Sequence, residues 1–163
     1  MNVLERIVTF LNGVGICTIQ GAVPSSSFLP GVRISSGALV YDPAQLRWPG
    51  DLLHEAGHIA IAPAALRPTL NDGVEIPSDI PHASEVEATA WAFAALHHLR
   101  LDPSVLFHSG GYRGASPGLI NTFMLGVYPG SFGLSQAGMT NVGPEAQRQG
   151  LPVYPALSHW LRP

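Results

Sequence analysis

The sequence predicts an α+β fold in which a short antiparallel sheet packs on two helices. Apolar residues recur at helical spacing in residues 3–11, which favours an opening helix. Residues 32–42 carry apolar and β-branched side chains on both sides of a Ser-Gly turn signal, a pattern typical of a hairpin. Strong helix formers then fill residues 52–62 and 84–99, so two longer helices are expected beside the sheet.

Turn and helix-breaking residues set the limits of the N-terminal elements. Gly13 and Gly15 end the first helix, and the β-branched residues 15–19 predict a brief first strand. Residues 21–31 are rich in proline and serine and predict a loop. Cys17 lies in the expected strand, so we expect it to belong to the core.

Start and stop residues also frame the two longer helices. A Pro-Gly-Asp segment can begin the first of them, and Pro63 must end it. Ser84 takes the N-cap position of the second, with Glu87 three residues later completing a capping box. Residues 67–82 between them lack periodicity and are rich in proline, so we expect a long loop that borders a site.

A chain of 163 residues suits one domain. Residues 1–100 hold the elements described so far and form its expected core. After Pro103 the composition shifts to Gly, Pro, Ser and aromatic residues, so residues 101–163 are expected to form an irregular helical extension. Ser116 would cap one helix of this extension, over residues 117–127.

Composition excludes several classes of function. Apolar residues make up 46% of the chain and charged residues 12%, which predicts a packed core. The net charge is -3, and the 8 basic residues are scattered arginines, so nucleic-acid binding is not expected. No apolar run approaches the roughly 20 residues that cross a bilayer, so no membrane association is expected either.

Cys17 is the only cysteine, which excludes an internal disulfide and a cysteine-based metal cluster. Glu5 and Arg6 interrupt the first apolar stretch, so it is expected to be a helix rather than a signal peptide. Both observations favour a reducing, cytoplasmic location.

One motif carries recognisable chemistry. His54, Glu55 and His58 form an HExxH pattern inside an expected helix. Positions four apart on a helix differ by about 40° of rotation, so both imidazoles point the same way and can bind one ion. Glu55 follows the first ligand on the same turn and can take a proton from a water bound to that ion. The pattern therefore predicts a zinc site with a glutamate general base.

A catalytic zinc ion usually has three protein ligands, so a third must come from elsewhere. Glu85 and Glu87 begin the next helix, but their side chains point about 200° apart, so only one can face the ion. Glu85 is favoured, because it shares its face with small residues that can pack closely on Gly57. Glu87, His82 and His108 remain alternatives.

A zinc hydrolase that acts on a carbonyl group also needs a donor for the oxyanion that forms when water attacks. His108, Tyr112 and Arg113 are candidates, although their glycine-rich surroundings also suit an ordinary loop. The hairpin at residues 32–41 could offer a free edge to an extended substrate, or could simply pack in the core.

The HEAGH motif followed by SEVEATAWAFAA resembles the gluzincin metallopeptidases, most closely the minimal gluzincins of the radiation-response and immunity-repressor-cleaving group. The resemblance covers residues 4–99. It implies a zincin-like domain in which His54, His58 and Glu85 bind zinc and Glu55 is the base. Thr89 stands where the related peptidases often have an acid or amide that orients a ligand.

We therefore expect a zinc-dependent peptidase acting on a peptide or protein substrate; the resemblance also allows cleavage of one regulatory protein alone. The alternative is a catalytically silent metal-binding interaction module that keeps the gluzincin fold but has a blocked fourth coordination position. The sequence leaves the oligomeric state open.

Overall fold

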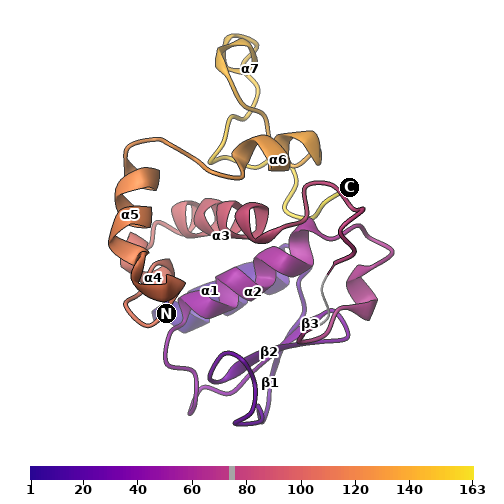
Figure 1. Ribbon diagram of the computed structural model, residues 1–163, viewed down its shortest axis with the longest axis vertical. Helices are drawn as coiled ribbons and strands as arrows, with labels where there is room; N and C mark the ends of the chain where they lie inside the picture. Colours follow the sequence, from indigo (N-terminus) through magenta and orange to yellow (C-terminus); the bar gives the residue numbers. More distant parts are fainter. Residues whose placement is uncertain (74–75) are drawn as a thin grey trace.

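The structure is a computed structural model that describes residues 1–73 and 76–163. In this part of the chain it is a mixed α and β fold with seven α-helices and a three-stranded sheet (Figure 1). The strands are β1 (Thr18–Gln20), β2 (Val32–Ser35) and β3 (Ala38–Tyr41). The helices are α1 (Val3–Gly13), α2 (Gly50–Ile61), α3 (Glu85–His98), α4 (Pro103–Leu106), α5 (Ser116–Met124), α6 (Ser131–Gln136) and α7 (Pro144–Arg148), with 3-10 turns η1 (Arg67–Thr69) and η2 (Tyr112–Gly114). None of these helices is long and apolar enough to cross a bilayer.

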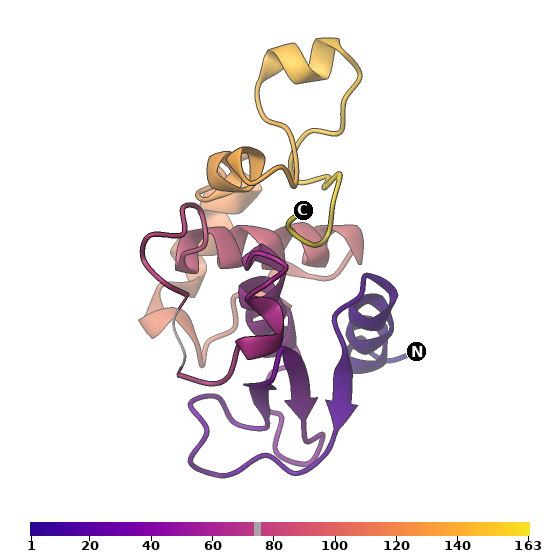
Figure 2. The same ribbon diagram turned by 90° about the vertical axis from the view of Figure 1, so that its right-hand side faces the viewer.

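The sheet is mixed rather than antiparallel, which corrects the prediction. Its order is β1-β3-β2, with β2 antiparallel to β3 but β1 parallel to β3. Successive strands do alternate in direction. However, β3 inserts between β2 and β1, and so lies beside the strand that runs the same way (Figure 2). Loop 21–31 permits this order because it leaves room for β3 between the two earlier strands.

The predicted hairpin is present, and its turn has the expected conformation. Ser36 and Gly37 both adopt positive φ angles, 47° and 75°. Two consecutive left-handed residues are typical of the two-residue turns whose twist matches that of paired strands. At Gly37 an added Cβ would lie 2.3 Å from the carbonyl oxygen of Arg67, so glycine is also required for close approach.

Helices α2 and α3 form the centre of the fold and cross in close contact. A Cβ added at Gly57 would lie only 2.5 Å from the carbonyl oxygen of Ala88. The two backbones therefore touch, as the sequence predicted from the glycine and the small residues of the facing helix. Leu52, Leu53 and Trp91 are fully buried around this crossing. The crossing sets the distance between the first turn of α3 and the middle of α2.

Replacing Gly57 with alanine is expected to destabilise the protein by about 1–3 kcal/mol, because the new methyl group overlaps backbone that cannot move independently. The matched control is Gly118→Ala in α5, where an added Cβ would meet nothing within 4 Å. Urea unfolding of both variants measures the difference. Equal stabilities would contradict the close contact between α2 and α3.

The C-terminal residues fold into short helices that cover one side of α3. Helices α4 and α6 contact α3, whereas α7 projects away from the rest of the molecule (Figures 1 and 2). The helix predicted over residues 117–127 runs from Ser116 to Met124. Ser116 is not its N-cap, because the hydroxyl donates a hydrogen bond to the His108 carbonyl oxygen at 2.7 Å instead. Cys17 is exposed rather than buried, which corrects its assignment to the core.

Candidate metal centre

Helix α2 places two imidazoles side by side on the surface that faces the start of α3. The Nε2 atoms of His54 and His58 are 3.3 Å apart, and their rings are nearly perpendicular, at 81°. The helix begins near Pro49 and ends before Pro63, as predicted, so both histidines lie within regular helix. Their side chains are 18% and 24% exposed, which leaves their Nε2 atoms in reach of a ligand.

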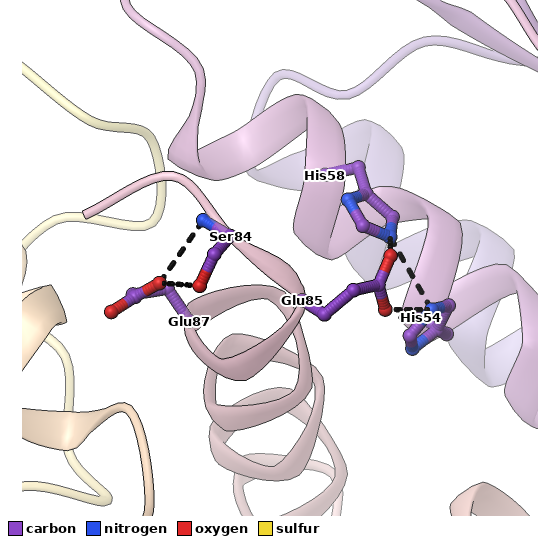
Figure 3. Close-up of polar contacts among 5 residues, drawn as sticks. All are labelled: His54, His58, Ser84, Glu85 and Glu87. Atoms are coloured by element: carbon purple, nitrogen blue, oxygen red, sulfur yellow. Dashed lines mark hydrogen bonds and ion pairs between the residues drawn. The ribbon is translucent and has the colours of Figure 1, made fainter. Parts of the chain in front are cut away.

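Glu85 reaches the same point from the first residue of α3. One carboxylate oxygen lies 3.4 Å from Nε2 of His54, and the other lies 3.1 Å from Nε2 of His58 (Figure 3). These hydrogen bonds to two imidazoles hold the pKa of Glu85 far below its usual range. Of the two glutamates at the start of α3, Glu85 is the one that joins both histidines in one cluster.

The spacing of these three groups is close to that of ligands around one zinc ion. Zinc binds imidazole nitrogen and carboxylate oxygen at roughly 2.0–2.2 Å, so neighbouring ligand atoms around it are expected about 3.3–3.5 Å apart. The two Nε2 atoms are 3.3 Å apart, and they lie 3.4 and 3.1 Å from two different oxygens of the Glu85 carboxylate. His54, His58 and Glu85 could therefore hold a metal ion. Within residues 1–73 and 76–163, no further His, Cys, Asp or Glu joins this group.

Glu87 does not take part in the cluster. Its carboxylate turns back and accepts a hydrogen bond from the Ser84 backbone N–H at 3.0 Å (Figure 3). Ser84 completes the reciprocal capping box that the sequence predicted. The other two alternative ligands, His82 and His108, also lie outside the cluster. Glu87 stabilises the start of the helix on which Glu85 stands.

Glu55 follows His54 on α2, beside the candidate metal ligands, and is half-buried. Burial raises the pKa of its carboxyl group, and the neighbouring imidazoles of His58 and His54 oppose that rise. A raised pKa brings a carboxylate closer to the range in which a general base both accepts and returns a proton. The arrangement can therefore combine an ion held by three ligands with an adjacent proton acceptor.

The cluster opens to solvent on the side of α3. The Glu85 side chain is 73% exposed although it contacts both imidazoles. An open ligand position is what distinguishes catalytic zinc sites from structural ones, in which four protein ligands enclose the ion. The exposed carboxylate therefore places one side of the cluster in contact with solvent.

His108 is buried away from solvent and pairs with a residue of α2. Its Nε2 lies 2.9 Å from the Asp51 carboxylate, and the two residues are only 5% and 7% exposed. The imidazole also stacks on Trp48, with ring centroids 4.6 Å apart and planes 8° apart. This pair was not predicted, because it joins residues distant in sequence. His108 is therefore placed to hold structure rather than to contact a substrate.

Tyr112 is the member of the predicted oxyanion trio that lies next to the cluster. Its ring is perpendicular to that of His54, at 89° and 5.9 Å between centroids. Burial raises the pKa of its phenol far above the usual value, and the negative charges of Asp51, Glu85 and Glu55 add to the rise. The phenol consequently keeps its proton and remains a hydrogen-bond donor. Arg113, by contrast, is exposed.

The outer edge of the hairpin is not free. Ile34 of β2 donates its backbone N–H to the Asp72 carboxylate at 2.7 Å and accepts the Asp72 backbone N–H at 3.0 Å. Ser36 donates to the Asn71 side chain at 3.0 Å. Residues 70–72 thus occupy the edge that the sequence suggested for an extended substrate, and that prediction is wrong for β2.

Comparison with known proteins gives no relative from which a function could be transferred: the chain matches no family model, no curated protein and no solved structure. The functional assignment therefore depends on the cluster itself. What the residues and their geometry establish is a candidate metal centre of two histidines and one glutamate, with a second glutamate beside it.

Proposed function

We propose that this chain is a zinc-dependent peptidase with a gluzincin-type ligand set. The observation that carries the proposal is the convergence of His54, His58 and Glu85, whose nitrogen and oxygen atoms lie close enough together to bind one ion. Two imidazoles and one carboxylate form a donor set that zinc prefers in hydrolytic sites. The resemblance of the HEAGH and SEVEATA segments to gluzincins assigns the same three residues as ligands.

The proposed chemistry uses the residues around that ligand set. A bound zinc ion would supply Lewis acidity and lower the pKa of a coordinated water. Glu55 would take a proton from the attacking water and pass it to the nitrogen of the leaving amine. Tyr112 keeps its phenolic proton and would donate a hydrogen bond to the substrate oxygen as negative charge develops there.

The covered outer edge of β2 supports a restricted range of substrates. An extended peptide usually gains affinity by pairing with an unoccupied strand. Here residues 70–72 already use the outward-facing groups of Ile34 and Ser36. We propose that the substrate is a particular protein, one whose shape matches the open site, rather than unfolded protein in general.

A silent metal-binding module is the competing function. It would require the fourth coordination position to be blocked. The 73% exposure of the Glu85 side chain supports a site that is open to solvent rather than blocked. The peptidase proposal is therefore preferred.

Hydrolysis is expected to depend on zinc and to spare general substrates. The purified chain, with no metal-affinity tag, would be incubated with a proteome-derived mixture of folded proteins, and new N-termini would be identified by mass spectrometry. We expect few cleavages, all lost after chelation and restored by stoichiometric zinc, with casein left intact. Cleavage that survives chelation would contradict the proposal, and a zinc-loaded chain that cleaves nothing would favour the silent module.

A further inference from the structure

One polar atom of the cluster formed by His54, His58 and Glu85 is buried without a hydrogen-bond partner among the described residues. The Nδ1 atom of His54 is inaccessible to solvent and has no hydrogen-bond partner among the described residues. Metal-binding imidazoles usually donate this second N–H to a carboxylate or carbonyl, which fixes both the tautomer and the orientation of the ring. Something other than such a hydrogen bond must therefore orient His54.

The ring of Tyr112 is the packing partner best placed to do so. It meets the His54 ring edge to face, at 5.9 Å between centroids and 89° between planes. Perpendicular aromatic pairs at such distances are attractive, so the contact favours one orientation of the His54 ring. The His58 ring is also nearly perpendicular to the His54 ring, at 5.0 Å between centroids and 81° between planes.

We propose that the aromatic ring of Tyr112 is a positioning group that orients His54 for metal binding, in place of the usual hydrogen bond at Nδ1. This role rests on the proposed metal site, but it belongs to the ring and not to the hydroxyl. It is therefore separate from donation of a hydrogen bond to a substrate oxygen.

The loop that carries Tyr112 is anchored to the first turn of α2. His108 stacks on Trp48 and bonds to Asp51, and its carbonyl oxygen accepts the Ser116 hydroxyl at 2.7 Å. These contacts fix both ends of the loop. Because α2 also carries His54, the loop and the imidazole it contacts share one rigid support.

Two glycines let the loop wrap closely around this anchor. A Cβ added at Gly110 would lie 2.6 Å from Nε1 of Trp48, and one added at Gly111 would lie 3.0 Å from Cε1 of His108. Tyr112 itself has a φ of 56°, in the left-handed region that non-glycine residues rarely adopt. Such a conformation persists only where the surroundings enforce it, and it is common at functional sites.

Zinc affinity of three variants tests the role. Tyr112→Leu removes the ring and is expected to weaken zinc binding by about 10- to 100-fold, the range typical of lost orienting groups. Tyr112→Phe keeps the ring and should bind zinc like the parent. Gly110→Ala displaces the loop without altering a site residue and should also weaken binding. Affinity is measured by competition with a chromophoric chelator, and circular dichroism of the metal-free proteins confirms that each is folded.

Parental affinity in folded Tyr112→Leu would overturn the proposal, and so would an equal loss in Tyr112→Phe, which would assign the effect to the hydroxyl. The measurement needs no hydrolysis, so it can succeed even if the chain proves not to be a peptidase. A parent that binds no zinc at all would overturn both this role and the proposed function. If the chain is a peptidase, Tyr112→Phe should lose turnover while keeping zinc, which separates the two roles of the residue.

Discussion

Turnover by the Glu55→Gln variant is expected to fall by about 10²- to 10⁴-fold while its zinc content stays at the level of the parent. General acid–base catalysis contributes an effect of this size, and glutamine cannot accept the proton. His54, His58 and Glu85 are unchanged in the variant, so the ligand set is intact. Turnover is measured on a substrate identified in the cleavage screen, and zinc by elemental mass spectrometry.

The control for this variant is Glu145→Gln on α7. Glu145 is exposed, pairs with Arg148 on the same helix and lies on the part of the chain that projects from the rest of the molecule. The Glu145→Gln variant should hydrolyse the substrate at the same rate as the parent. If Glu55→Gln keeps normal turnover, Glu55 is not the base. If it loses zinc as well as turnover, the residue supports the site structurally and its assigned role is wrong.

The helices that carry the site could be predicted because their determinants are local. Pro63 ends α2, and the Ser84–Glu87 capping box begins α3, as the pattern indicated. The choice of Glu85 over Glu87 followed from the faces of one helix, and close packing on Gly57 followed from residue size alone. Rules for residues close in sequence were therefore sufficient to predict that these three candidate ligands lie together.

Features that depend on distant residues were missed. The insertion of β3 between β2 and β1 is not encoded in any strand by itself, so the sheet was predicted as antiparallel. The edge of β2 is covered by a loop more than thirty positions away, through Asp72 and Asn71. The pairing of Asp51 with His108 likewise joins α2 to a loop that showed only a glycine-rich pattern. Such contacts join segments that are far apart in the sequence, so no local pattern of residues indicates them.

Zinc is expected to be lost from His58→Ala and Glu85→Ala but retained by Glu87→Ala. Each of the first two variants removes one of three converging ligands, and the affinity should fall by more than about 100-fold, since loss of an orienting group alone reaches that value. Glu87 is two residues from Glu85 and equally charged, but it bonds to Ser84 instead. It is therefore a matched control for charge and for position on the helix.

Unfolding with and without zinc separates the two glutamates further. Zinc at 100 times the dissociation constant of the parent should stabilise the parent by about 2.7 kcal/mol, and at the same zinc concentration this increment should fall below about 0.4 kcal/mol in Glu85→Ala. Glu87→Ala loses a capping interaction, so its metal-free stability should fall by about 1 kcal/mol, but the zinc increment should remain. The opposite pattern, with the increment kept in Glu85→Ala and lost in Glu87→Ala, would exchange the roles of the two carboxylates. Because the cap and the cluster lie on the same turn of α3, only this zinc-dependent difference distinguishes a residue that binds the ion from one that holds the helix.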